Sequence, residues 1–189
     1  KFRFYVLYDK ICLPHFLREA YRRVRSNHGS PGVDGVTFEM IEARGREAFL
    51  AEISSELKSG AYRPLPVLRR MIPKPNGKER PLGIPAIRDR VVQMSCKLVI
   101  EPVFEADFEE CSYGFRPKRS AKGAVKKIKE ALLAGKTDVF DADLSSYFDT
   151  IPHDKLLITL AQRISDHRVL GLIQRWLTAP VSENGRLRG

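Results

Sequence analysis

Apolar residues recur along the first third of the chain at the three- and four-residue spacing of amphipathic helices. Between residues 14 and 27 the apolar side chains form one stripe and arginines occupy other positions, which predicts a helix. Residues 26–35 contain three glycines and a proline, which predicts a loop. A second helix is expected from Thr37, a suitable N-cap, to about Leu57, with Gly60 after its end.

The pattern becomes β-like in the middle of the chain and then helical again. Residues 67–73 and 80–84 predict two short strands joined by a turn at 75–78, so this region is interpreted as a hairpin. A long helix is expected over about 87–108. Another is expected over 120–134, with lysines along one face.

The last third of the chain combines one short strand with two helices. Residues 139–144 predict the strand, and helices are expected near 153–163 and 166–178, before a terminal loop at 182–189. The order is helices, a hairpin, helices and then a strand that carries acids. This order favours an α+β fold over a regular alternation of strands and helices.

The net positive charge of the chain makes a polyanion an expected partner. The 189 residues carry a net charge of +10 and a pI of about 9.7, and 43% of them are hydrophobic, enough for a folded core. Positive charge of this size favours nucleic acid, because neutralised phosphates release counterions. The alternative at this point is a soluble basic protein with no such partner.

The cysteines and the apolar runs exclude other classes of protein. Three cysteines are widely spaced without a CxxC pair, so reduced thiols are expected rather than a zinc site or a disulfide framework. No apolar run approaches the length of a bilayer span, and the first eight residues do not resemble a signal peptide. A cytoplasmic protein that does not interact with membranes is therefore expected.

An acidic segment suggests a metal ligand. On the predicted strand, Asp141 and Asp143 would point to the same side, where two carboxylates repel unless a cation lies between them. Mg²⁺ takes oxygen ligands, often one or two carboxylates plus substrate phosphates. The alternative is a sheet edge with solvated acids. Asp149 suits helix capping at least as well as catalysis, and His153 is interpreted as structural.

The predicted hairpin carries a dense group of cations. Such a group can bind a triphosphate or a nucleic-acid backbone, although lysines also protect exposed strand edges from aggregation. A basic hairpin and an acidic strand in one chain are the pair of elements that phosphoryl transfer requires. The cations are Arg69, Arg70, Lys74, Lys78 and Arg80.

Four segments occur in the order found in one known family. They are SPGVDG at 30–35, IPKPNGKERPLGIP at 72–85, SYGFRPKRS at 112–120, and the segment 141–149, which begins DAD and ends FD. Together they resemble the early sequence blocks of group II intron-encoded reverse transcriptases, the intron maturases. The resemblance extends from about Tyr8 to Gly189.

The resemblance implies part of a right-hand polymerase. Residues 1–135 would form the fingers, including an N-terminal extension, and 136–189 the first part of the palm. The family continues with a glutamine-glycine motif and a palm hairpin that bears two aspartates, and neither string occurs in this sequence. The chain is therefore expected to be a piece of a longer protein, truncated before the palm catalytic hairpin, and to be inactive alone.

The resemblance also implies roles for individual residues at the polymerase centre. Asp143 would be the catalytic aspartate and a metal ligand, and the backbone carbonyl of Leu144 would also face a metal. Lys74 and Arg80 would hold the incoming triphosphate. Phe148 would be the steric gate that rejects a ribose 2′-hydroxyl.

Template contacts are implied for two further segments. The 30–35 loop, with Ser30 and Gly32, resembles the extension that lies over the template near the primer end. The 112–120 segment would touch the template or help to build the nucleotide pocket, through Arg116, Lys118 and Arg119.

The function implied is RNA-directed DNA synthesis with two Mg²⁺ ions in a bacterial cytoplasm. The expected partners are an RNA template, intron RNA, a DNA primer or target, deoxynucleoside triphosphates and a second copy of the chain. Three alternatives are an RNA-binding maturase with vestigial acids, a related enzyme that serves a CRISPR integrase or phage defence, and an unrelated basic DNA-binding module. The last does not explain four ordered segments.

Overall fold

The computed structural model describes residues 2–73, 77, 79–144 and 147–188. The chain divides into two compact units, one formed by Lys1–Ile100 together with His153–Gly189 and the other by Glu101–Pro152. The division falls inside helix α5 (Ile87–Glu105). None of the helices in the described residues has both the length and the apolar character that a bilayer crossing requires.

The first unit begins with four helices. They are α1 (Tyr8–Ile11), α2 (Pro14–Ser26), α3 (Phe38–Arg44) and α4 (Arg46–Ser59). The prediction for α2 is confirmed, whereas the single helix expected after Thr37 is wrong. The chain breaks it at Gly45, whose φ of 104° lies outside the helical region and is open to glycine because glycine has no Cβ.

The two expected ends of this broken helix are correct. The Thr37 side chain accepts a hydrogen bond of 3.3 Å from the backbone N–H of Met40, so it caps α3. Gly60 ends α4 with a φ of 74°, in the left-handed region where a Cβ would be strained. Local sequence signals therefore located the ends correctly and missed the interruption between them.

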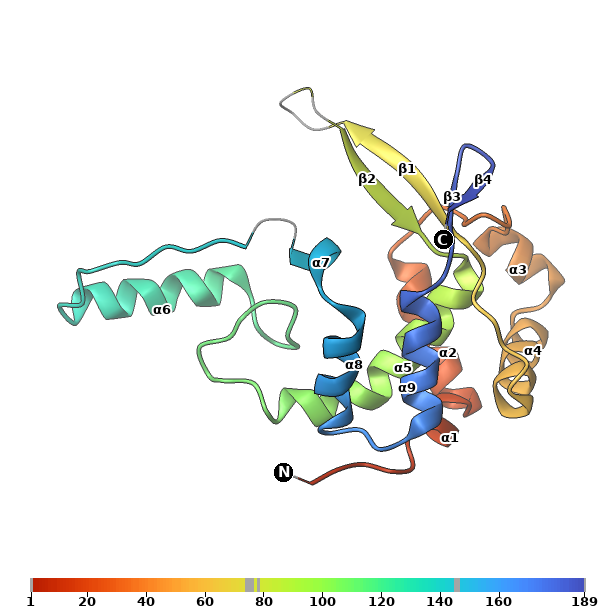
Figure 1. Ribbon diagram of the computed structural model, residues 1–189, viewed down its shortest axis with the longest axis horizontal. Helices are drawn as coiled ribbons and strands as arrows, with labels where there is room; N and C mark the ends of the chain where they lie inside the picture. Colours follow the sequence, from red (N-terminus) through yellow and green to blue (C-terminus); the bar gives the residue numbers. More distant parts are fainter. Residues whose placement is uncertain (1, 74–76, 78, 145–146, 189) are drawn as a thin grey trace. The chain divides into compact units, whose positions relative to one another are not determined.

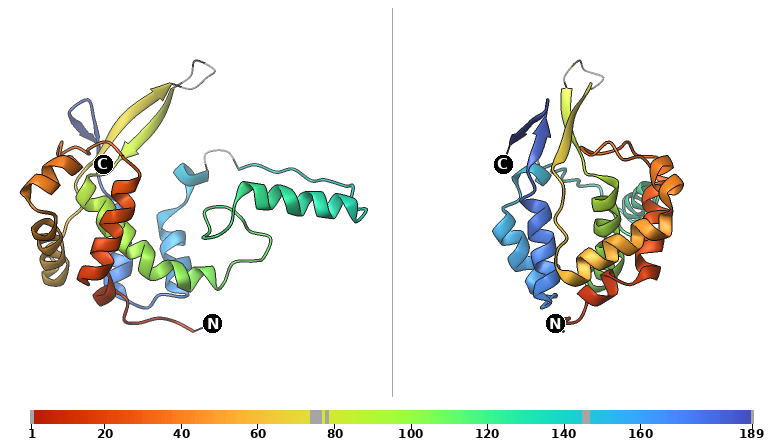
Figure 2. Two further views of the ribbon diagram at one scale, coloured as in Figure 1. Left: turned by 180° about the vertical axis from the view of Figure 1, so that it is seen from behind. Right: turned by 90° about the vertical axis from the view of Figure 1, so that its right-hand side faces the viewer.

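The sheet of the first unit has four strands in the order β2-β1-β3-β4. The predicted hairpin is confirmed as β1 (Val67–Pro73) paired antiparallel with β2 (Glu79–Ile84). It extends away from the helices of its own unit (Figures 1 and 2). β3 (Val181–Glu183) pairs parallel with the start of β1, and β4 (Arg186–Arg188) pairs with β3.

The terminal loop predicted for 182–189 is wrong, because residues 181–188 form the β3-β4 hairpin. Asn184 and Gly185 connect the strands with φ values of 51° and 77°. Two successive residues with positive φ are typical of the tight hairpin turn that Asn-Gly favours. The dipeptide was therefore a readable signal for this hairpin.

The first unit is completed by α5 up to Ile100, α8 (His153–Ala161) and α9 (His167–Leu177). The core is formed by apolar side chains from α1, α2, α4, α5 and α9, so segments far apart in the sequence fold together. Fully buried examples are Ile11, Leu17, Leu57, Val91, Val92, Val169 and Leu172.

Asp166 joins the two ends of the first unit. One of its carboxylate oxygens caps α9 by accepting bonds of 3.1 and 3.4 Å from the N–H groups of Arg168 and Val169. The other accepts bonds of 2.9 and 2.8 Å from Leu7 and Tyr8, at the start of α1. A carboxylate that is only 8% exposed thus satisfies four backbone donors.

The second unit contains α6 (Ala121–Leu133) and the short helix α7 (Tyr147–Thr150). Ser120 caps α6 through a bond of 3.2 Å from the N–H of Gly123, as expected for a helix over 120–134. The strand predicted at 139–144 is wrong, because these residues form no regular structure. A strand is stabilised by pairing, and no other strand in the described part of this unit pairs with the segment.

Candidate functional site

The acidic segment presents its carboxylates to solvent. Asp141 and Asp143 are exposed and lie in the irregular stretch after α6. Their expected orientation on one strand face is not supported, because the strand is absent. Among the residues that the structure describes, no three acidic, histidine or cysteine side chains gather into a metal site. Two nearby carboxylates are nevertheless oxygen donors of the kind that a hard divalent ion takes with water and phosphate.

An aromatic contact joins two of the motifs within the second unit. The ring of Phe148, the predicted gate, meets the ring of Phe115 edge-on at 6.3 Å between centroids, with an angle of 83°. Tyr147 lies 5.5 Å from Phe148 in a similar geometry. Phe148 is 74% exposed and Phe115 92%, so the pair stands on the surface rather than in a core. Exposed aromatic faces of this kind can contact a sugar or a base.

Arg116 stabilises the turn that carries Phe115. Its guanidinium donates to both carboxylate oxygens of Glu105, at 2.8 to 3.1 Å, and to the carbonyls of Glu109 and Ser112 at 2.6 and 3.0 Å. The side chain is only 6% exposed. The hydrogen bonds from Arg116 lower the pKa of Glu105. The observed contacts of Arg116 are therefore structural, and its contact with a template stays a prediction.

The other two basic residues of this motif differ from Arg116. Lys118 is exposed and has a φ of 61°, which turns the chain sharply. Arg119 lies over the ring of Tyr113 at 5.3 Å from its centroid, and it donates to the carbonyl of Glu110 at 3.3 Å. Their roles toward a template stay predictions. Of the two, Lys118 has the more accessible charge.

In the first unit, the hairpin has one cationic face. Ile72 lies opposite Arg80 in the register, and Arg70 lies opposite Leu82, so both arginines project from the same side of the hairpin. Both are exposed. Lys74, the other predicted triphosphate ligand, lies outside the described residues. The hairpin thus presents Arg70 and Arg80 on a single face, and the register between the strands places Arg80 there.

The 29–35 loop packs against the start of α5. Gly32 is buried, and a Cβ at this position would lie 2.5 Å from the Cα of Ala86 and 2.6 Å from its nitrogen. Arg90 donates to the carbonyl of Ser30 at 2.5 Å. Gly32 therefore has a packing role that the sequence did not indicate. The template contacts predicted for Ser30 and Gly32 stay predictions.

Replacing Gly32 by alanine should destabilise the protein by about 1–3 kcal/mol, because the added methyl group meets rigid backbone rather than a flexible side chain. Gly171 is a matched control, since it lies inside α9 with nothing within 4 Å of an added Cβ. Gly171→Ala should stabilise by about 0.5–1 kcal/mol through helix propensity. Chemical denaturation of both variants measures the difference, and equal stabilities would contradict the close packing at Gly32.

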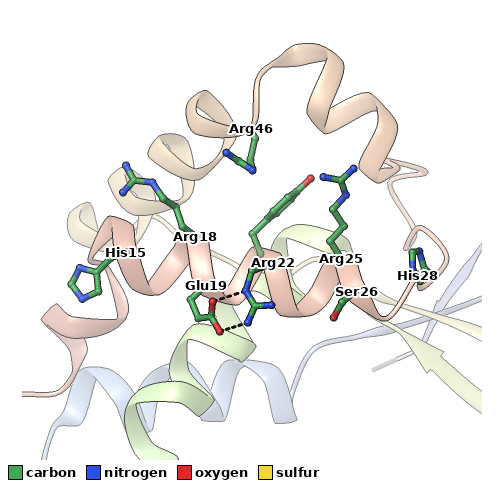
Figure 3. Close-up of a pocket in the computed structure, with 9 residues that line it drawn as sticks. His15, Arg18, Glu19, Arg22, Arg25, Ser26, His28 and Arg46 are labelled. Carbon is green, nitrogen blue, oxygen red and sulfur yellow. Dashed lines mark hydrogen bonds and ion pairs between the residues drawn. The ribbon is translucent and has the colours of Figure 1, made fainter.

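A shallow groove of about 570 Å³ runs along α2 and is lined by arginines. Figure 3 shows Arg18, Arg22 and Arg25 projecting from α2, with Arg46 at the start of α4. Carboxylates largely compensate these charges. Glu19 binds both Arg22 and Arg23, and the hydrogen bonds from these two arginines lower the pKa of Glu19 to about 2. Two further ion pairs join Arg18 to Glu47 and Arg25 to Glu42. The arginines of this groove thus form surface ion pairs with neighbouring carboxylates, and these pairs leave little positive charge for binding an anion.

The sequence analysis missed three residues that position these segments. Asp89 and Arg90, at the start of α5, bind the segment before β1 and the 29–35 loop respectively. Phe115 contacts the predicted gate. A signal was available for the first two, because the three consecutive charged residues 88–90 open a helix that is mostly apolar after them. No local signal indicated the contact of Phe115, because its partner lies far along the chain.

Comparison of the sequence with known proteins identifies several relatives of this chain. The chain is 45% identical over 184 residues to protein YkfC of Escherichia coli, which covers 94% of the chain and 48% of that protein. It is 34% identical over 179 residues to the group II intron-encoded protein LtrA of Lactococcus lactis, covering 94% of the chain and 29% of LtrA. A nuclear intron maturase of Arabidopsis thaliana is 34% identical over 90 residues, covering 48% of the chain and 12% of that protein.

The chain thus spans about half the length of YkfC and less than a third of LtrA. Residues 72–189 match the family described as reverse transcriptase (RNA-dependent DNA polymerase). The match covers β2, the turn at Arg116 and the acidic segment, and so contains three of the four motifs. This chain belongs to the reverse transcriptase family, among the group II intron reverse transcriptases and maturases.

Proposed function

We propose that the intact protein is an RNA-directed DNA polymerase that copies RNA into DNA by nucleotidyl transfer. The observation that carries this proposal is the family match over residues 72–189, which includes both Arg80 of the hairpin and Asp143. Within it, residues 1–135 would act as fingers with an N-terminal extension and 136–189 as the first part of the palm. The hairpin cations belong to the first compact unit and Asp143 to the second.

The residues present fit part of a divalent metal site. Asp143 would be a metal ligand, joined by the backbone carbonyl of Leu144, and both residues are exposed. Bound divalent ions supply activation of the attacking hydroxyl and stabilisation of the leaving pyrophosphate. Two ions need more donors than these two residues offer. The remaining donors would therefore come from other parts of the intact protein.

The side chains of this chain would bind and orient the substrates. Arg80, with Lys74, would neutralise the triphosphate, because a planar guanidinium can bind two phosphate oxygens at once. Phe148 would lie against the sugar and exclude a 2′-hydroxyl. The loop with Ser30 and Gly32 and the basic residues Arg116, Lys118 and Arg119 would position the template.

The proposed partners follow from the same family. They are an RNA template, intron RNA, a DNA primer or target, and deoxynucleoside triphosphates. The net charge of +10 supports polyanionic partners. A second copy of the chain is also proposed, because the described part of the second unit exposes apolar side chains. Light scattering of this chain tests that association, and the exposed residues include Val125, Leu133, Val139 and Phe140.

Primer extension on an RNA template tests the proposed activity. The intact protein with Mg²⁺ should extend an annealed DNA primer when all four deoxynucleotides are present. Residues 1–189 alone should extend none, because the carboxylates among the described residues gather into no site that could hold two ions. No extension by folded, template-bound intact protein would refute the proposal. Extension by residues 1–189 would refute the assignment of the missing donors to other parts of the protein.

A second candidate function is RNA binding without polymerisation. The name of the Arabidopsis relative, a nuclear intron maturase, favours it. In that case the intact protein would bind intron RNA, and substitution of Asp143 would change nothing measurable. The same extension assay, combined with a filter-binding assay for RNA, separates the two functions.

A further inference from the structure

Asp89 binds the segment that leads into the hairpin. It lies in the first turn of α5 and is 1% exposed. One of its carboxylate oxygens accepts a bond of 2.7 Å from the hydroxyl of Tyr62, and the other accepts a bond of 2.9 Å from the backbone N–H of Leu65. A buried carboxylate thus connects α5 to the irregular stretch immediately before β1.

Helix α9 holds the same stretch from another direction. The indole N–H of Trp176 donates to the Tyr62 hydroxyl at 3.1 Å, and Arg175 donates to the Tyr62 carbonyl at 3.2 Å. The N–H of Val67 donates to the carbonyl of Pro180 at 2.8 Å. Since residues 61–66 form no regular structure, these contacts define where β1 begins.

Both strands of the hairpin have their base close in sequence to the residues that Asp89 connects. β1 begins at Val67, two residues after Leu65, and β2 ends at Ile84, three residues before α5. Asp89 therefore links the base of β1 to the helix that continues from β2. A strand of seven residues extends roughly 20 Å, so a tilt of about 5° at the base would move its far end by roughly 2 Å.

We propose that Asp89 is a positioning residue for the incoming nucleotide. It would set the angle of the β1-β2 hairpin, and with it the placement of Arg80, without touching the nucleotide itself. This inference rests on the proposed function, in which the hairpin binds the triphosphate. A merely structural Asp89 would lower stability when changed and leave nucleotide binding by the folded protein unaltered.

The test compares two buried aspartates that receive the same substitution. Asp166, like Asp89, accepts backbone N–H bonds, and it lies in the same compact unit, but it binds α1 and α9 rather than the hairpin. Asp89→Asn and Asp166→Asn in the intact protein should both lower the melting temperature. Tyr62→Phe, which removes one of the two bonds to Asp89, is available where Asp89→Asn does not fold.

Steady-state primer extension below both melting temperatures gives the decisive result. Asp89→Asn should raise the KM for deoxynucleotides between about ten- and a hundredfold, because small misplacements of a binding group have effects of this size. Its kcat should change much less, and Asp166→Asn should leave both constants near the wild-type values. A KM for Asp89→Asn or Tyr62→Phe that equals the KM of Asp166→Asn would overturn the proposal.

Hydrogen exchange of the hairpin amides gives a readout that does not depend on activity. Exchange within Val67–Pro73 should be faster in Asp89→Asn and unchanged in Asp166→Asn. An inactive wild-type protein would refute the proposed function, whereas the exchange result would still decide whether Asp89 holds the hairpin. Unchanged exchange in Asp89→Asn would refute the positioning role in an active enzyme as well as in an inactive one.

Discussion

Replacing Asp143 by asparagine in the intact protein should reduce primer extension by at least about a thousandfold, equivalent to about 4 kcal/mol of transition-state stabilisation. Asparagine keeps the size of the side chain and one oxygen but removes the negative charge that a divalent ion requires. Asp143 is exposed, and no hydrogen bond within the described structure depends on it, so folding should be unaffected. Extension from an RNA template measures the loss, and thermal unfolding checks the fold.

Asp141→Asn is the matched control, because Asp141 is equally exposed and lies two residues away in the same segment. It should retain extension within a few-fold of the wild type. Template affinity should be nearly unchanged in both variants, since neither position belongs to the basic residues assigned to the template. If Asp141→Asn lost activity and Asp143→Asn did not, the metal ligand would be Asp141 rather than Asp143.

The second large effect concerns the choice of sugar. Phe148→Ala should lower the preference for deoxynucleotides over ribonucleotides on the order of a hundredfold, the selectivity that an apolar wall typically provides against an added hydroxyl. The ring is 74% exposed and belongs to a short helix, so its removal should have little effect on stability. The ratio of kcat/KM for the two nucleotides is the measurement.

Phe115 provides the control for this substitution. Its ring contacts Phe148 edge-on, so Phe115→Ala removes a neighbour of the gate without removing the gate. We expect an intermediate loss of selectivity, because Phe148 would keep its contact with Tyr147. Unaltered selectivity in Phe148→Ala would exclude the gate, whatever Phe115→Ala does.

Predictions from local sequence succeeded where the stabilising interactions are local. Helix α2, the Thr37 cap and the Gly60 end depend on side chains and backbone within a few residues. The same holds for the β1-β2 hairpin, whose paired strands are close together in the sequence. In each case the physical signal and the structure that it specifies lie in one short stretch.

The failures have different physical causes. The helix after Thr37 is interrupted at Gly45, which the apolar periodicity on either side concealed. The strand predicted at 139–144 needed a pairing partner that its own sequence cannot provide. The β3-β4 hairpin, by contrast, has a local signal, because Asn184 and Gly185 favour its tight turn.

The sequence alone determined the family and the chemical character of the site. Four ordered motifs identified a reverse transcriptase, and the cluster of cations over residues 69–80 marked the basic hairpin. These properties are encoded in residue order and side-chain type. They therefore needed no knowledge of the tertiary structure.

Only the tertiary structure decided which residues support that chemistry. Gly32 packs on Ala86, Asp89 binds the approach to β1, and Phe115 meets Phe148, across separations that no local pattern encodes. Such contacts depend on how distant segments pack, because steric fit and buried hydrogen bonds are satisfied only once the chain has folded. The sequence thus identified the reactive groups, and the folded chain identified the residues that hold them in place.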